Sequence, residues 1–129
     1  MPTIQHDGVS FHYIEAGQGP VLALLHGFPL DSTVWEEQVR MLSDRYRVIA
    51  LDQRGFGRSR CESAFTLESL ADDAHAILGK LNALPCVLAG LSMGGYVALS
   101  FVRKYPRSLR GLVLVDTKAA AAHPGVLQV

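Results

Sequence analysis

An α/β fold with a mostly parallel sheet between two layers of helices is predicted by two features of the sequence. Apolar runs of strand length, such as 21–25, 48–51 and 86–89, alternate with segments whose apolar residues recur at helical spacing. These runs contain no polar residues in alternation, which indicates strands that are buried on both faces. Repeated units of strand, helix and strand imply parallel strands with helices on both sides, a three-layer sandwich.

The N-terminal segment differs, because it predicts an antiparallel hairpin. Thr3–His6 and Val9–Ile14 have the length of strands, and Asp7-Gly8 between them is a strong signal for a two-residue turn. The first buried strand, Val21–Leu25, follows.

Three helices are expected between the later strands. Thr33 and Glu36 have the spacing of a capping box, and the apolar residues behind them continue at helical spacing. Apolar residues mark one face of a second helix over 67–81, and a third helix is expected over 93–105, closed by Pro106. A last strand is expected over 109–115.

Composition bounds the class of protein. The chain has 129 residues, 49% of them hydrophobic and 19% charged, with 12 basic and 12 acidic residues and a formal net charge of zero. This predicts one globular domain over 1–129 and gives no electrostatic reason to expect nucleic acid or a membrane surface as partner. Cys61 and Cys86 are too few for a disulfide framework or a zinc site, and no signal peptide or membrane span is recognised. We therefore expect a cytoplasmic protein without a metal.

A candidate nucleophile lies in the pattern G-x-S-x-G. Gly90-Leu91-Ser92-Met93-Gly94 follows a predicted buried strand and precedes a predicted helix, the context in which this pattern forms a nucleophile elbow. Such a turn places Ser92 on a strained backbone, and Gly90 and Gly94 lack the Cβ atoms that would keep strand and helix apart. The competing interpretation is that Ser92 is an ordinary turn residue.

Two further motifs follow the ends of the neighbouring strands. His26-Gly27-Phe28-Pro29 could supply the backbone N–H of Phe28, which together with that of Met93 would form an oxyanion hole. The segment 52–59 contains Asp52 and Arg54, for which we expect loop capping and an ion pair rather than contact with a ligand.

The three motifs, H-G-F-P, D-x-R-G-x-G-x-S and G-x-S-M-G-G in this order, resemble those of the α/β-hydrolase superfamily. The resemblance implies a sheet with strand order 1-2-4-3-5-6-7-8, a triad in the order Ser, acid, His, and no cofactor. It is closest to small serine esterases and the haloperoxidase-like branch. Because the elbow carries Ser92 rather than Asp, it disfavours the haloalkane dehalogenase and epoxide hydrolase branches.

Mapped onto this family, the chain corresponds to strands 1–6, a truncated core without a cap domain. The loops that usually deliver the acid and the histidine are expected to be missing. Asp116 and His123 follow Ser92 in the correct order and could form an improvised acid and base, in the same chain or from a partner chain. His26, whose family role is to hold the oxyanion loop, is the alternative base.

Two functions are compatible with these residues. The first is hydrolysis of small carboxylic esters through an acyl-enzyme on Ser92, weak because the usual acid and histidine loops are absent. The second is a catalytically silent half-hydrolase that serves as an assembly or binding module. In both, strand 109–115 is expected to be an uncovered edge, which predicts a homodimer through this edge or the C-terminal tail.

Overall fold

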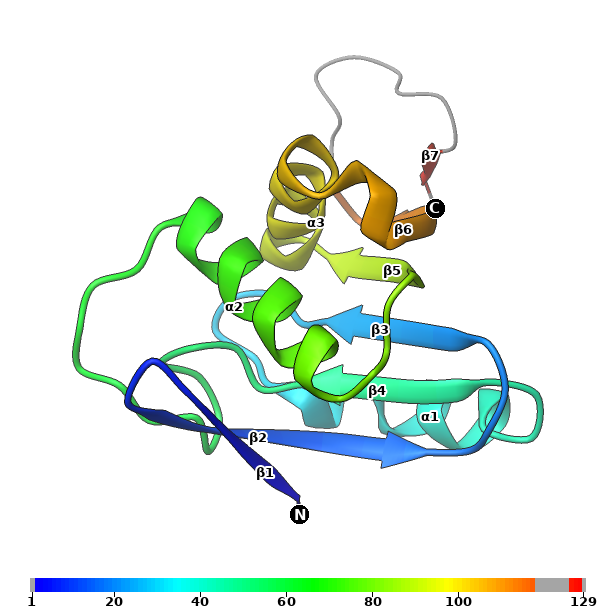
Figure 1. The fold of residues 1–129 in the computed structure, drawn as a ribbon, viewed down its shortest axis with the longest axis horizontal. Helices are drawn as coiled ribbons and strands as arrows, with labels where there is room; N and C mark the ends of the chain where they lie inside the picture. Colours follow the sequence, from blue (N-terminus) through cyan, green and yellow to red (C-terminus); the bar gives the residue numbers. More distant parts are fainter. Residues whose placement is uncertain (1, 118–125, 129) are drawn as a thin grey trace.

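A seven-stranded sheet lies between helices on its two faces in the computed structural model, which describes residues 2–117 and 126–128 (Figure 1). The strands are β1 (Thr3–His6), β2 (Val9–Ala16), β3 (Val21–Leu25), β4 (Arg47–Leu51), β5 (Cys86–Leu91), β6 (Leu109–Val115) and β7 (Val126–Gln128). The helices are α1 (Glu36–Leu42), α2 (Leu67–Lys80) and α3 (Met93–Lys104), with 3₁₀ helices at Ser32–Trp35 and Pro106–Ser108. The predicted α/β class is confirmed.

The sheet has the order β1-β2-β4-β3-β5-β6-β7. β1 and β2 form the predicted antiparallel hairpin, and β2 also pairs antiparallel with β4. All pairs from β4 to β7 are parallel. The carboxyl ends of β3, β4 and β5 therefore meet at one edge of the sheet, where ligands bind in open α/β folds.

The prediction that β6 is an uncovered edge strand is wrong for the middle of this strand. β7 pairs with β6 in parallel, and the register places Val126 opposite Leu112 and Gln128 opposite Leu114. A strand of three residues is shorter than the runs that periodicity can identify, so the sequence pattern did not reveal it.

The two faces of the sheet are covered unequally. α2 and α3 lie together on one face, over the larger core cluster, which includes Phe11 and Phe101 (Figure 1). α1 lies on the other face, where Trp35 and Val39 pack against Leu24 in a smaller cluster.

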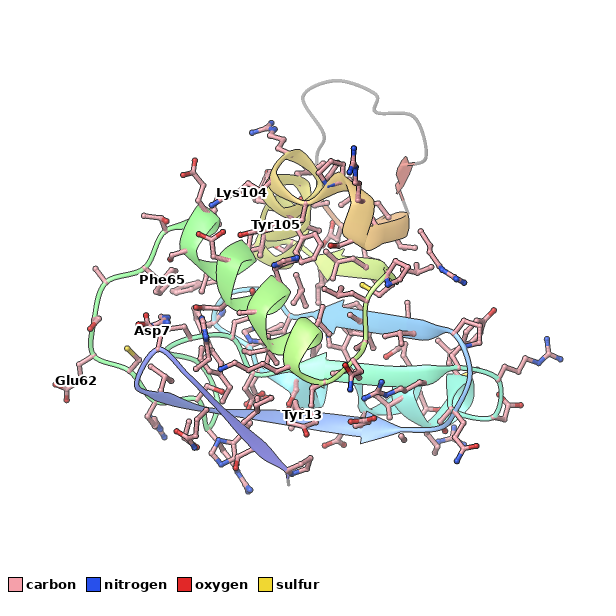
Figure 2. The ribbon with its side chains drawn as sticks, viewed as in Figure 1. Asp7, Tyr13, Glu62, Phe65, Lys104 and Tyr105 are labelled. Carbon is pink, nitrogen blue, oxygen red and sulfur yellow. The ribbon has the colours of Figure 1, made fainter. Side chains whose placement is uncertain are left out.

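Polar contacts join α2 to α3. The Tyr105 hydroxyl donates to Asp72 Oδ1 at 2.5 Å, and Lys104 forms an ion pair with the same carboxylate at 2.6 Å. Figure 2 shows the side chains of Lys104 and Tyr105 on the α2 side of α3. These contacts hold the pKa of Asp72 below its usual value, because hydrogen bonds from Lys104 and Tyr105 favour the charged form.

The helix before β4 begins differently from the prediction. Asp31, not Thr33, is the N-cap: its side chain accepts from the Thr33 N–H at 2.9 Å, and a 3₁₀ turn precedes α1. The cause is local, because Asp31 can reach the N–H two residues later and so starts the turn earlier. The expected second helix does have a capping box, made by Thr66 and Ser69.

None of the helices in the described part of the chain combines the length and the apolar character needed to span a bilayer.

Candidate active site

Ser92 lies on the sharp turn between β5 and α3. Its backbone has φ 53° and ψ −112°, and the residue is exposed. A positive φ is uncommon for a residue with a Cβ and marks local strain. The turn is tied to the neighbouring strand, because the Ser92 N–H donates to the Val115 carbonyl oxygen at 3.0 Å.

Glycines make this turn possible by bringing backbone into contact with backbone. A Cβ on Gly90 would lie 2.2 Å from the Gly94 carbonyl oxygen. A Cβ on Gly94 would lie 2.3 Å from the Leu25 carbonyl oxygen and 2.7 Å from that of His26. A third glycine, Gly95, lies against a side chain instead, because a Cβ there would be 2.5 Å from Thr117 Cγ2. The requirement for glycine at 90 and 94 is therefore a steric one.

The loop after β3 lies against this elbow. A Cβ on Gly27 would be 3.0 Å from the Leu91 carbonyl oxygen and 3.2 Å from Ser92 Cβ. The Leu30 N–H donates to the Gly27 carbonyl oxygen at 2.8 Å, which closes a tight turn. Neither the Phe28 N–H nor the Met93 N–H donates to any residue that the structure describes. Both predicted oxyanion donors thus belong to segments that touch at Ser92.

His26 is fully buried and both of its ring nitrogens are engaged. Nε2 lies 3.0 Å from the Gln53 backbone nitrogen and accepts its N–H, and Nδ1 lies 3.0 Å from the Gly27 carbonyl oxygen. Since a carbonyl oxygen accepts, the proton is on Nδ1 and Nε2 is unprotonated. Burial lowers the pKa of His26 and keeps the ring neutral. Phe56 covers this ring edge-on, with centroids 5.2 Å apart.

This geometry argues against His26 as a general base. A base needs a free lone pair aimed at the Ser92 hydroxyl. The only lone pair on the neutral ring already accepts the Gln53 N–H. His26 supports the loop instead.

Asp52 caps two loops. Its carboxylate accepts from the Ser32 N–H at 2.7 Å and from the Arg58 N–H at 3.0 Å, and the residue is buried. Gly57 packs directly on it, because a Cβ there would lie 2.5 Å from Asp52 Oδ2. The expectation of loop capping is confirmed.

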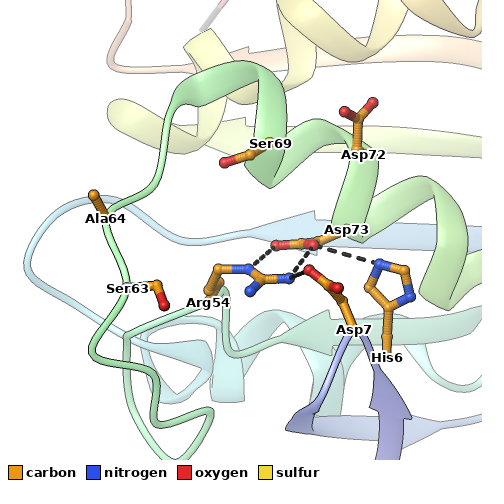
Figure 3. A pocket seen from close by; sticks show the side chains of 8 residues that line it. All are labelled: His6, Asp7, Arg54, Ser63, Ala64, Ser69, Asp72 and Asp73. Carbon is orange, nitrogen blue, oxygen red and sulfur yellow. Dashed lines mark hydrogen bonds and ion pairs between the residues drawn. The ribbon is translucent and has the colours of Figure 1, made fainter.

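Arg54 forms the expected ion pair. Its Nε and Nη2 donate to the two carboxylate oxygens of Asp73 at 2.8 and 2.9 Å, and Nη2 also reaches Asp7 at 3.0 Å. The carboxylate of Asp73 raises the pKa of Arg54 further. These groups line a cavity of about 390 Å³ together with His6, whose Nε2 lies 3.5 Å from Asp73 Oδ1. Figure 3 shows how their side chains lie around it.

Of the predicted acid and base, the structure describes Asp116 but not His123. Asp116 directly follows Val115, the residue that accepts the Ser92 N–H, and its side chain is exposed. Its φ is +50°, so the chain turns sharply there. His123 lies outside the described residues, and the pairing of these two remains a prediction.

Gln53 is the residue at this edge that sequence reasoning missed. It is buried, and it contacts His26 through its backbone N–H and through its side chain. The sequence feature that could have indicated Gln53 is its position directly after Asp52 in the motif D-x-R-G-x-G-x-S.

Known proteins resemble the chain over most of its length. A family model described as alpha/beta hydrolase fold matches residues 20–127. Epoxide hydrolase 4 of Mus musculus is 36% identical over 128 residues, which are 95% of this chain and 34% of that protein. A pimeloyl-[acyl-carrier protein] methyl ester esterase of Aeromonas hydrophila is 41% identical over 101 residues, 77% of this chain and 38% of that protein.

Solved structures show the same likeness. A thermophilic esterase from Thermogutta terrifontis is 43% identical, with a TM-score of 0.84, over 95% of this chain and 46% of that one. The chain thus spans between about a third and a half of the length of these proteins. The order of the strands, the strained serine and the matched family model lead to one conclusion: the chain belongs to the α/β-hydrolase family.

Proposed function

We propose that the chain hydrolyses small carboxylic esters through an acyl-enzyme on Ser92. The observation that carries this proposal is the strained, exposed serine at an elbow against which the Gly27 loop packs. The Ser92 hydroxyl attacks the acyl carbon, and the carbonyl oxygen becomes an oxyanion that accepts from the N–H groups of Phe28 and Met93. The alcohol then leaves, and water cleaves the acyl-serine ester.

The chemistry of serine supports an ester over an epoxide, although epoxide hydrolases are among the relatives. Attack of the Ser92 hydroxyl on an epoxide would leave an alkyl ether, which water does not cleave under mild conditions. Attack on an ester leaves another ester, which water can cleave after the same oxyanion has formed. The Aeromonas relative is a methyl ester esterase, and the Thermogutta structure is that of an esterase.

A base is still required to take the Ser92 proton. We assign it to His123, oriented by Asp116, in the same chain or in a partner. With such an improvised pair, most of the rate enhancement is expected to come from oxyanion stabilisation and binding, which alone give about 10³ to 10⁴ over water, so activity of the 129-residue chain is expected to be weak. Cys61 and Cys86 are free thiols, in keeping with the proposed cytoplasmic location.

Turnover of a short-chain p-nitrophenyl ester tests the proposal. Ser92→Ala is expected to remove the activity, whereas Ser63→Ala, a change at another exposed serine, is expected to leave it intact. His123→Ala should match Ser92→Ala if the improvised pair operates. A fluorophosphonate should add its mass to the peptide that contains Ser92. Wild-type turnover equal to that of Ser92→Ala would refute an enzymatic role.

The second candidate is a catalytically silent module that forms homodimers. Large apolar side chains exposed near the motifs favour it, among them Phe28 at 66% and Leu30 at 43% exposed. β7 is also the last strand of the described sheet, and none of the described strands pairs with its outer edge. Light scattering coupled to gel filtration should give the mass of a dimer at micromolar concentration. A compact monomer would contradict this candidate.

A further inference from the structure

We infer that Gln53 is a positioning residue that aims the Phe28 N–H at the developing oxyanion. The inference rests on the function proposed above, in which this N–H stabilises the transition state. Gln53 does not touch the reacting atoms. It acts through His26 and the two peptide groups that follow it.

The direction of the Phe28 N–H is set by the other end of its peptide group. In a trans peptide the C=O and the N–H point in opposite directions, and the Gly27–Phe28 bond is not one of the two cis bonds of the described residues. The Gly27 carbonyl oxygen accepts from the Leu30 N–H at 2.8 Å and from His26 Nδ1 at 3.0 Å. Groups that fix this oxygen therefore fix where the Phe28 N–H points.

Gln53 controls the imidazole that makes one of these two bonds. Its backbone N–H donates to His26 Nε2 at 3.0 Å. This bond requires an unprotonated Nε2 and so places the proton on Nδ1, where it can be donated to Gly27.

The Gln53 side chain controls the preceding peptide group. Nε2 of its amide donates to the His26 carbonyl oxygen at 2.9 Å. Gln53 is only 1% exposed, and its Oε1 has no hydrogen-bond partner among the described residues. Within the described part of the chain, the hydrogen bond to His26 is therefore the one that this side chain makes. The same carbonyl oxygen lies against Gly94 of the elbow, so this bond fixes the loop where it contacts the elbow.

Two substitutions separate the amide donor from the volume of the side chain. Gln53→Met keeps the volume and removes the donor. Gln53→Glu places a carboxyl group there, which repels the His26 carbonyl oxygen when ionised and donates to it when protonated. Gln38→Met is the matched control, because Gln38 is exposed on α1.

The first readout is nuclear magnetic resonance of the 129-residue chain. In Gln53→Met we expect a shifted Phe28 amide signal and about tenfold faster exchange of the Leu30 amide, whose bond to Gly27 is loosened. The Nδ1–H form of His26 should persist, since the backbone donor remains. In Gln53→Glu the Phe28 signal should move toward its wild-type position as the introduced carboxyl group is protonated, and Gln53→Met should show no such titration.

The second readout is ester turnover. Gln53→Met is expected to lower kcat about tenfold with KM nearly unchanged, because the misaimed donor is needed only in the transition state. Phe28 and Leu30 signals in Gln53→Met identical to those in Gln38→Met would overturn the inference. If the Gln53→Met chain does not fold, the pH titration of Gln53→Glu is the test. A Phe28 amide signal that does not change as the introduced carboxyl group is protonated would then overturn the inference. If wild-type turnover equals that of Ser92→Ala, the proposed function fails, whereas the amide signals still decide whether Gln53 positions the loop.

Discussion

Two loops at the carboxyl edge of the sheet are held in place by opposite means. The elbow around Ser92 depends on side chains that are absent, because Gly90 and Gly94 let backbone approach backbone. The loop after β4 depends on side chains that are present, because Asp52 and Arg54 tie it to distant segments. The elbow should therefore fail when an atom is added, and the loop should fail when a partner is removed.

Adding one methyl group to the elbow should have the largest effect. Gly94→Ala puts a Cβ within 2.8 Å of backbone atoms of β3 that cannot rotate away. We expect a loss above about 4 kcal/mol in the free energy of unfolding, measured by urea denaturation. Gly79→Ala is the control: its Cβ would lie 3.9 Å from Leu84 Cδ1, and the helix should gain about 0.5 to 1 kcal/mol. Equal free energies of unfolding for the two variants would contradict the hypothesis that glycine is required at 94 for steric reasons.

Removing a charge from the loop should have the next largest effect. Arg54→Met leaves the buried carboxylate of Asp73 without its guanidinium, and we expect a loss of about 3 kcal/mol. Arg40→Met removes an exposed ion pair with Glu37 and should change stability little. Similar urea midpoints for the two variants would show that the ion pair between Arg54 and Asp73 does not stabilise the fold.

A smaller loss is expected when the cap of the same loop loses one acceptor. Asp52→Asn keeps the shape but turns an NH₂ group toward one of the two N–H donors, those of Ser32 and Arg58. We expect a cost of about 2 kcal/mol, also by urea denaturation. Asp44→Asn, at an exposed position, should cost almost nothing. The hypothesis of loop capping is wrong if both changes are silent.

The smallest effect is one of pH, and it tests the segment that the loop after β4 holds, because the Gln53 N–H of that loop donates to His26 Nε2. His26 has its pKa lowered by burial, so the unfolded chain takes up a proton near pH 6.5 before the folded chain does. Stability should therefore fall as the pH drops below about 6.5, by up to about 1.4 kcal/mol per pH unit until the folded pKa is reached.

Burial lowers the pKa of His75 as well, so His75 would contribute to the same pH dependence. Stability should therefore be measured in a His75→Phe variant, which keeps a ring stacked on Tyr105. Urea midpoints that stay constant from pH 7.5 to 5.5 in this background would contradict the role given to His26.

The sequence was most informative where burial alone decides the structure. Val21–Leu25 and Leu109–Val115 are strands with the predicted bounds, because the apolar runs 21–25 and 112–115 are favoured between helix layers. β2 and β5 extend two residues further than predicted, since hydrogen bonds to a neighbouring strand continue past the apolar run. β7 depends on pairing with β6 and not on its own composition, so no local pattern revealed it.

The candidate site also contains residues that the sequence could predict and a contact that it could not. Ser92, Gly90 and Gly94 could be predicted because a turn needs these residue types at fixed spacing. The contact of Gln53 with His26 joins positions 27 residues apart and follows only from the order of β3 and β4 in the sheet.

Trp35 is the one tryptophan of the chain, and it is buried on the face covered by α1. Its fluorescence therefore reports the environment of the smaller cluster, whereas far-ultraviolet circular dichroism is dominated by α2 and α3 on the opposite face. Unfolding curves that coincide for the two signals would show that both faces melt as one cooperative unit. Curves that separate would reveal an intermediate in which one helix layer has left the sheet while the other still covers it.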